Sequence, residues 1–254
     1  MAEAAALSTA EFRFYEELND FLAPARRKRA FAYAFRGTPS VKDAIEALGV
    51  PHTEVDLVLV DGESVDFGRC LAGGERVAVY PVFERLDIAP LVRLRPRPLR
   101  HARFVLDVHL GKLARYLRLL GFDTLYRTDF DDPELVRLSV AESRTILTRD
   151  LGLLKHAAVT RGHWVRATDP RRQAGEIVAA FDLGGCAQPF TRCLRCNGEL
   201  RPVAKEAVAD RLPPLVRAHC EVFTQCRDCG RLYWPGSHHA RLRQIVDELV
   251  VSAP

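Results

Sequence analysis

The spacing of apolar residues in the first third of the chain is typical of strands around a single helix. Four segments with alternating or continuous apolar residues are expected to be strands: residues 11–15, 31–35, 55–60 and 76–82. Between the second and third, Ser40 is suited to be the N-cap of a helix that Gly49 ends. Asp61-Gly62 is a strong hairpin signal after the third strand. This order predicts an α+β layer, with one helix on a sheet.

The pattern changes after residue 102, where short apolar segments alternate with segments of helical period. We expect strands over residues 103–106, 124–128, 145–148 and 163–167. A helix is expected after each of them, over residues 111–120, from Pro133 onward, and over 151–160 and 171–183. Strand–helix units in series predict an α/β domain with a parallel sheet covered on both faces. A last amphipathic helix is expected over residues 238–251.

A segment rich in proline and arginine separates these two patterns. Residues 93–101 contain two prolines and four arginines, which suit neither a helix interior nor a central strand. We interpret them as a linker. The predicted organisation is therefore a first domain over residues 11–92, the linker over 93–101, a second domain over 102–185 and a cysteine-containing module over 186–254.

Charge is distributed unevenly between the two parts of the chain. Residues 1–99 hold 13 basic and 15 acidic residues, whereas residues 100–254 hold 24 and 18, a net charge of +6. This difference points to an anionic partner for the second part. Only five of the 37 basic residues are lysines, and arginine suits phosphate, although a bias toward arginine codons would give the same ratio.

The chain lacks the patterns of a membrane or secreted protein. No stretch approaches the ~18 apolar residues that cross a bilayer, and the first residues lack the basic and apolar regions of a secretion signal. We therefore expect a cytoplasmic protein with no membrane partner. In that compartment a disulfide scaffold is the weaker explanation for the seven cysteines.

Aspartates follow closely after every predicted strand of the second domain: Asp107, then Asp129, Asp131 and Asp132, then Asp150, and finally Asp169. Because parallel strands end at the same edge of a sheet, three or four of these carboxylates are expected in one crevice. Such a cluster needs a cation, and Mg²⁺ or Mn²⁺ prefers oxygen ligands. One or two of these ions can activate water for phosphodiester cleavage. The alternative is that each aspartate is a helix N-cap or turn residue.

Four of the cysteines form two C-x₂-C pairs, Cys193 with Cys196 and Cys226 with Cys229. Four thiolates in this arrangement can surround one structural Zn²⁺. A redox pair and two local disulfides are the alternatives, and His238 or His239 could replace one sulfur. Asn197 and Gly230 follow the two pairs, and both residue types tolerate a positive φ at such a turn. The other three cysteines are expected to be buried.

The segment Asp107-Val-His-Leu-Gly-Lys-Leu-Ala-Arg-Tyr-Leu-Arg-Leu-Leu-Gly-Phe-Asp123 resembles the signature of the Mut-seven C-terminal RNase domain family, a branch of the PIN-like nucleases. The resemblance continues in Ile146-Leu-Thr-Arg-Asp150 and through the cysteines to Tyr233-Trp-Pro-Gly-Ser-His238. It implies a PIN-like fold with a zinc ribbon and metal-dependent RNase chemistry on RNA. Asp107 and Asp150 match the acidic motif best, Asp132 is next, and Asp169 is the fourth candidate, for which Asp129 or Asp131 could substitute.

Basic residues accompany this signature. Lys112, Arg115 and Arg118 lie on the predicted helix after Asp107, and Arg149 precedes Asp150. We expect them to contact RNA phosphates. The alternatives are a solvated helix face and, for Arg149, an ion pair with an acid. Tyr233 and Trp234 are candidates for stacking on RNA bases or for packing within the module.

The first domain resembles the ubiquitin-like β-grasp fold, on the segments 57–63 and 73–79 and on the order of its elements. Its sulfur-carrier branch reacts through a C-terminal Gly-Gly tail. Here Gly73-Gly74 is internal, so we expect a domain that binds a protein partner.

The sequence thus predicts an RNA-cleaving hydrolase with one structural zinc and one or two catalytic Mg²⁺ or Mn²⁺ ions. Two alternatives stay open: an RNA- or ribosome-binding adaptor of the same fold without turnover, and a scaffold that works through the first domain.

Overall fold

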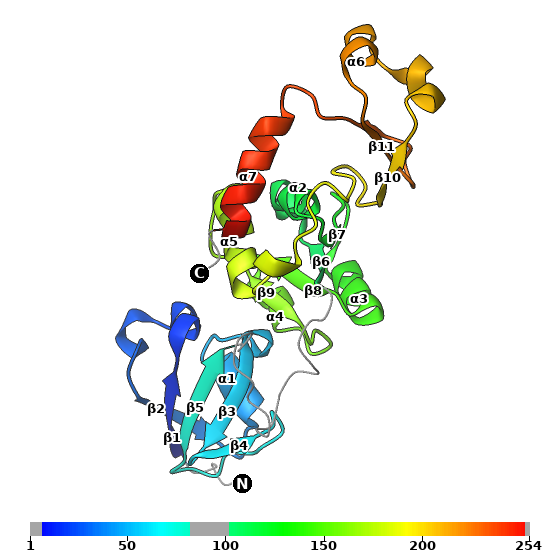
Figure 1. The fold of residues 1–254 in the computed structure, drawn as a ribbon. Helices are drawn as coiled ribbons and strands as arrows, with labels where there is room; N and C mark the ends of the chain where they lie inside the picture. Colours follow the sequence, from blue (N-terminus) through cyan, green and yellow to red (C-terminus); the bar gives the residue numbers. More distant parts are fainter. Residues whose placement is uncertain (1–6, 82–101, 252–254) are drawn as a thin grey trace. The chain divides into compact units, whose positions relative to one another are not determined.

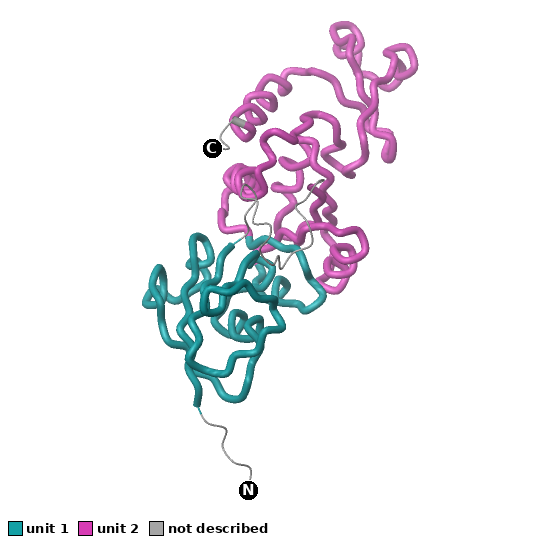
Figure 2. The backbone as a smooth tube through the Cα atoms, turned by 60° about the horizontal axis from the view of Figure 1, so that its bottom comes forward, with its two compact units in different colours: residues 1–100, 150–164 teal, residues 101–149, 165–254 magenta. Residues whose placement is uncertain are grey.

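The structure is a computed structural model that describes residues 7–81 and 102–251 (Figure 1). The predicted linker over residues 93–101 lies outside the described residues. The chain divides into two compact units, one formed by residues 1–100 with 150–164 and the other by residues 101–149 with 165–254 (Figure 2). The first unit therefore contains residues from both sides of the predicted linker.

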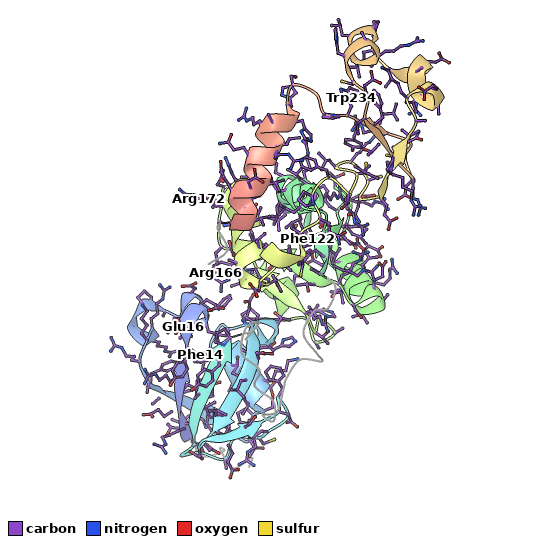
Figure 3. The ribbon with its side chains drawn as sticks, in the orientation of Figure 1. Phe14, Glu16, Phe122, Arg166, Arg172 and Trp234 are labelled. Atoms are coloured by element: carbon purple, nitrogen blue, oxygen red, sulfur yellow. The ribbon has the colours of Figure 1, made fainter. Side chains whose placement is uncertain are left out.

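A five-stranded sheet forms the centre of the first unit. Its strands are β1 (Leu7–Phe14), β2 (Phe31–Arg36), β3 (Val55–Val60), β4 (Glu63–Val65) and β5 (Arg76–Pro81), in the order β2-β1-β5-β3-β4. β1 and β5 are parallel and the other neighbours are antiparallel. This arrangement with the helix α1 (Val41–Ala47) confirms the β-grasp prediction. Phe12, Phe14 and Ile45 are fully buried in the core between them, and Figure 3 labels Phe14 on β1.

Local signals account for the ends of these elements. The side chain of Ser40 accepts a hydrogen bond from the Asp43 backbone, and that of Asp43 accepts one from the Ser40 backbone, which forms a capping box at the start of α1. Asp61 and Gly62 have φ values of 51° and 90°, as the hairpin between β3 and β4 requires. The short strand β4 was not expected. Three 3₁₀ helices complete this part: η1 (Glu16–Phe21), η2 (Pro24–Arg26) and η3 (His52–Glu54).

Residues 150–164, which contain α4 (Leu151–Leu154) and β9 (Gly162–Trp164), are hydrogen-bonded to residues 46–54 within the first unit. His52 is buried, and its ring nitrogens lie 2.6 Å from a Glu46 carboxylate oxygen and 2.8 Å from the Val159 carbonyl oxygen. Burial lowers the pKa of His52, although the hydrogen bond to Glu46 acts in the opposite direction. The buried carboxylate of Glu54 accepts a hydrogen bond of 2.6 Å from the Trp164 backbone. Buried polar contacts thus join this segment to the β-grasp region.

The second unit contains three parallel strands side by side, in the order β7 (Asp123–Leu125), β6 (Arg103–Leu106) and β8 (Thr145–Thr148). The helices of this unit around the strands are α2 (Gly111–Leu119), α3 (Asp132–Glu142) and α5 (Pro170–Ala180), with the 3₁₀ turns η4 (Val108–Leu110) and η5 (Gly184–Cys186). α2 packs against α5, and α5 against the last helix, α7 (His239–Val251). The ring of Phe104 on β6 meets those of Phe122 and Phe181 in the core, and Phe122 is labelled in Figure 3.

Several predicted elements are shorter than expected; the strand expected over residues 163–167, for example, is β9 (Gly162–Trp164). The helix expected over residues 151–160 ends at Leu154, because the following residues turn to present the Val159 carbonyl to His52. The strand expected over 124–128 begins at Asp123 and ends at Leu125, and the following Arg127 pairs with Asp129 instead of continuing the strand.

The cysteine-containing module forms a small antiparallel sheet in the order β10 (Leu200–Val203), β11 (Phe223–Cys226) and β12 (Leu232–Tyr233). η6 (Glu206–Arg211) and α6 (Pro214–His219) connect the first two strands. Only Val208, Leu212 and Phe223 form its buried apolar cluster, with residues such as Trp234 packed against it (Figure 3). Together with the β-grasp sheet and the parallel strands, this module confirms the predicted fold class.

Candidate active site and metal centre

Asp107 lies directly after β6, where its carboxylate connects the ends of two strands. Its backbone leaves the strand as the N-cap of η4, and Oδ1 accepts a hydrogen bond from the His109 backbone at 3.3 Å. Oδ2 accepts a hydrogen bond of 2.8 Å from the hydroxyl of Thr148, the last residue of β8. Thr148 is fully buried and Asp107 is half-buried. The half-buried carboxylate is thus held at the carboxyl edge of the sheet.

Three acidic residues follow β7, and they have different roles. Asp131 is the N-cap of α3 and accepts a hydrogen bond of 2.9 Å from the Glu134 backbone. Asp129 is exposed and pairs with Arg127, whose hydrogen bond lowers its pKa. Asp132 is the exposed first residue of α3, and within the described residues it has no hydrogen-bond or ion-pair partner. Of the three, Asp132 is therefore the one whose carboxylate is available to a ligand.

Asp150 and Asp169 both begin helices. The carboxylate of Asp150 accepts a hydrogen bond of 2.7 Å from the Gly152 backbone at the start of α4. One oxygen of Asp169 accepts two, each of 3.0 Å, from the Arg171 and Arg172 backbones at the start of α5. The N-cap alternative is therefore observed for Asp107, Asp131, Asp150 and Asp169. Capping alone does not exclude ion binding, because it engages one oxygen of a carboxylate.

The structure does not bring these aspartates together as a set of metal ligands. Among the residues that it describes, the only group of three or more His, Cys, Asp or Glu side chains whose ligand atoms meet is the group of four cysteines. The carboxylate crevice thus stays a prediction from the sequence.

The candidate RNA-binding residues also separate into two classes. Lys112 and Arg115 are exposed on α2. Arg118 is only 3% exposed, and its guanidinium donates to the carbonyl oxygens of Thr124, Leu194 and Arg195. The guanidinium of Arg149 donates to three carbonyl oxygens of residues 165–167. We therefore withdraw Arg118 as an exposed phosphate contact, because its hydrogen bonds hold the protein together.

The four predicted cysteines converge. The sulfur atoms of Cys193, Cys196, Cys226 and Cys229 all lie within 4.8 Å of one another. Cys193 lies 3.7 Å from Cys229, and Cys196 lies 3.4 Å from Cys226, sulfur to sulfur. Zinc–sulfur bonds of about 2.3 Å in a tetrahedron place the sulfurs about 3.8 Å apart. The donor set therefore fits one zinc ion.

Each C-x₂-C pair forms a turn, or knuckle: the first contains Cys193 and Cys196, and the second contains Cys226 and Cys229. The turns of both knuckles have the expected conformation. Asn197 and Gly230 have φ values of 73° and 68°, as predicted. Gly198 has no room for a side chain, since a Cβ atom there would lie 2.8 Å from the sulfur of Cys226. These residues let the backbone approach the four sulfurs closely.

The neighbours of Cys193 favour its thiolate. Burial acts to raise its pKa, but hydrogen bonds from the Tyr233 hydroxyl and from backbone N–H groups lower it to about 6. Burial raises the pKa of Cys196 to about 12, and its neighbouring thiols act in the same direction. A dication bound by all four sulfurs would displace the protons that remain on them.

Other residues that the sequence singled out are held by protein contacts or are exposed. The Tyr233 hydroxyl also accepts a hydrogen bond of 3.1 Å from the Leu194 backbone, which favours packing within the module, one of the two predicted roles of Tyr233. His239 packs on the ring of Phe190, 4.8 Å between centroids, and neither it nor His238 belongs to the cysteine group. Cys70 and Cys186 are exposed, contrary to the expectation that they are buried.

Sequence reasoning missed the contacts that dock the first knuckle on the parallel strands. The side chain of Asn197 accepts a hydrogen bond of 2.8 Å from the Thr124 backbone and donates one of 2.7 Å to Asp123. Asp123 also pairs with Arg144, which is only 4% exposed, at 2.8 Å. Burial acts to raise the pKa of Asp123, but the hydrogen bonds from Arg144 and Asn197 lower it to about 2. The residue types at positions 197 and 123 signalled a turn and a strand end, but not this contact.

Comparisons with known proteins agree with both halves of the architecture. Residues 102–246 match the family model of the Mut7-C RNAse domain, and residues 7–87 match that of Mut7-C ubiquitin. The crystal structure of H. volcanii small archaeal modifier protein 1 is 24% identical over 29% of this chain and 97% of that chain, with a TM-score of 0.24. None of the curated proteins matches the chain. Within residues 7–81 and 102–251, every helix is too short or too polar to cross a membrane.

Proposed function

The chain belongs to the Mut7-C RNAse domain family, and we propose that it is a metal-dependent ribonuclease that cleaves RNA at a set of aspartates. The observation that carries this proposal is the position of Asp107. Its carboxylate is held by the buried Thr148 at the carboxyl edge of the strands, where open α/β sheets bind their ligands.

Asp150 is the second candidate, because it follows β8 in the sequence and, with Asp107, matches the acidic motif of the family best. Asp132 and Asp169 follow the neighbouring strands and are the third and fourth candidates. Asp132 supports this assignment best, since no described residue engages its carboxylate.

The chemistry that we propose is hydrolysis of a phosphodiester. One or two Mg²⁺ or Mn²⁺ ions held by these carboxylates supply an activated water and offset charge on the phosphate. Lys112 and Arg115, both exposed on α2, are proposed to hold the RNA backbone. For Arg149 we keep only a supporting role, because its guanidinium is engaged by carbonyl oxygens.

The other assignments follow from the architecture. We propose that the four cysteines hold one structural zinc, and that the ubiquitin-like region, predicted over residues 11–92, binds a protein partner. The boundaries at residues 102–185 and 186–254 also stay proposals, as does a cytoplasmic location.

A second function, an RNA-binding adaptor without turnover, is favoured by one observation. Three of the four candidate aspartates cap helices, and within the described residues the aspartates form no group of metal ligands. An adaptor would need the basic surface and the zinc centre but no bound Mg²⁺ or Mn²⁺.

The test compares RNA cleavage by the wild-type protein and by Asp107→Asn in Mn²⁺, with EDTA as a further control. We expect the variant to lose most of the activity, because it keeps the shape of the side chain but removes an anionic ligand. Asp210→Asn, the same change at an exposed position of the second unit, is the matched control and keeps full activity. All proteins are purified in parallel, since a contaminating RNase would cleave equally in each.

Equal cleavage by the wild type and Asp107→Asn would show that the activity does not come from this carboxylate. Binding of RNA by both proteins with no cleavage in either would favour the adaptor.

A further inference from the structure

A cavity of about 400 Å³ in the second unit is lined mainly by arginines. Arg115 and Arg118 line it from α2, Arg195 from the first knuckle, and Arg231 from the residue before β12. Tyr126 lies on the same cavity, and no acidic residue is among the described residues that line it. The cavity therefore has four cationic groups and no carboxylate of its own.

Three of these arginines are unpaired. Arg115, Arg195 and Arg231 are exposed, and within the described part of the chain their side chains make no ion pair or hydrogen bond. Other exposed arginines of this unit do find acids, such as Arg127 with Asp129 and Arg201 with Glu199. Like charges that share one cavity repel unless an anion lies between them. The arrangement is therefore that of a site for an anion.

A role in balancing the charge of the zinc centre does not account for all four arginines. Four thiolates around one Zn²⁺ have a net charge of −2, whereas four guanidinium groups carry +4. Arg118 is the one fixed against the knuckle, through its hydrogen bonds to Leu194 and Arg195. The three exposed arginines would leave the cavity positive even when the metal is bound.

The position of the cavity indicates which anion it takes. The hydroxyl of Tyr126 donates a hydrogen bond of 2.9 Å to the carbonyl of Val108, the residue after Asp107. One residue of the cavity is thus hydrogen-bonded to the residue that follows the proposed catalytic carboxylate. Guanidinium groups are planar and have several donors, which suits the oxygens of a phosphate better than those of a compact halide.

We propose that this cavity binds a backbone phosphate of the RNA, next to the phosphodiester at the carboxylates. This proposal rests on the proposed RNA substrate, but not on cleavage of that substrate. Arg115, Arg195 and Arg231 contact the phosphate, and Arg118 positions the knuckle that carries Arg195. The cysteine-containing module then has a second purpose, since it supplies two of the three arginines that contact the phosphate.

The test measures binding of a labelled single-stranded RNA to the zinc-loaded full chain over a series of KCl concentrations. All variants are made in an Asp107→Asn background, so that the RNA stays intact. We expect Arg115→Gln, Arg195→Gln and Arg231→Gln together to weaken binding at low salt by about 10-fold to 100-fold. The slope of log affinity against log salt should fall by about 0.7, the value of one lost phosphate contact. Arg217→Gln, an exposed arginine of α6 outside the cavity, is the matched control and changes neither quantity.

Zinc content is measured for every variant, because Arg195 lies between two of the cysteines. If the triple variant loses zinc, the single change Arg115→Gln on α2 replaces it, with a smaller loss of affinity and a slope change of at most about 0.7 expected. Unchanged RNA affinity and slope in a zinc-replete variant would overturn the proposal, as would a parent protein that binds no RNA at low salt. Competition by inorganic phosphate without any effect of the variants on RNA would show an adventitious ion only, and would also overturn it. RNA binding with the expected losses but no cleavage by the wild-type protein would refute the proposed hydrolysis alone.

Discussion

The β-grasp region and the cysteine-containing module are both small sheets, but different forces stabilise them. The first has a continuous apolar core that includes Phe12, Phe14 and Ile45, all fully buried. The second buries only Val208, Leu212 and Phe223 as an apolar cluster. Apolar burial stabilises by about 1.5–3 kcal/mol per large side chain, so three residues cannot offset the entropy of ordering the module. The module therefore depends on the cysteine centre and on its contacts with the parallel strands.

Removing the metal should have the largest effect. Zinc contributes on the order of 10 kcal/mol to the folding of small zinc modules, so a chelator or Cys226→Ser should unfold β10, β11 and β12. Hydrogen exchange should show fast amides over residues 193–233 and unchanged protection in the β-grasp sheet. Cys70→Ser, at an exposed cysteine outside the module, is the control. A module that keeps its protection without metal would mean that its small apolar cluster suffices.

A core deletion in the β-grasp sheet should be next in size. Phe12→Ala removes a fully buried ring and should lower the free energy of unfolding by about 3–5 kcal/mol. Val222→Ala, at an exposed apolar residue of the cysteine-containing module, should change the free energy of unfolding by less than about 0.5 kcal/mol. Urea unfolding measures both. Similar effects of the two changes would show that the regions do not differ in the way proposed.

Breaking the ion pair between Asp123 and Arg144, beside the first knuckle, tests whether polar contacts also stabilise the cysteine-containing module. The lowered pKa of Asp123, about 2 against an ordinary 3.8, stabilises the fold by about 2 kcal/mol above pH 4. The carboxylate is ionised more readily in the folded state, so this contribution should be lost as the pH falls from about 4 toward 2. Asp123→Asn should remove it at neutral pH. Asp129→Asn, which breaks an exposed pair, should have a much smaller effect, because solvent screens that pair. Equal pH profiles for the wild type and Asp123→Asn would contradict the assignment.

The smallest effect is expected for residues 150–164. They follow the predicted linker in the chain but are hydrogen-bonded to the β-grasp region. Glu54→Ala removes the buried acceptor of the Trp164 backbone N–H and should cost about 1–2 kcal/mol. Faster hydrogen exchange is expected over residues 150–164. Glu63→Ala, at an exposed glutamate of β4, should leave this exchange unchanged. Unaltered exchange in the Glu54 variant would mean that the segment is held by its apolar contacts alone.

The sequence predicted best those elements whose signal is local. β6 and β8 have the predicted bounds because each is a short apolar run, and the zinc knuckles are predicted because C-x₂-C spacing places two sulfurs on one turn. Contacts between distant residues left no such signal. Arg115 and Arg118 are one helical turn apart and of the same type, yet one is exposed and the other buried against Leu194 and Arg195. Nor did any pattern indicate that His52 meets Val159, since periodicity reports only which face of an element is apolar.

The docking of the first knuckle has a practical consequence for protein engineering. A shortened protein that ends before residue 186 would retain Arg118 but lose two of its three carbonyl acceptors, and Asp123 would lose its amide partner. The new surface would contain a partly buried cation and an unsatisfied Thr124 N–H, and both would destabilise the shortened protein. A shortened protein designed from this chain should therefore keep the cysteine-containing module or redesign positions 118 and 123 together.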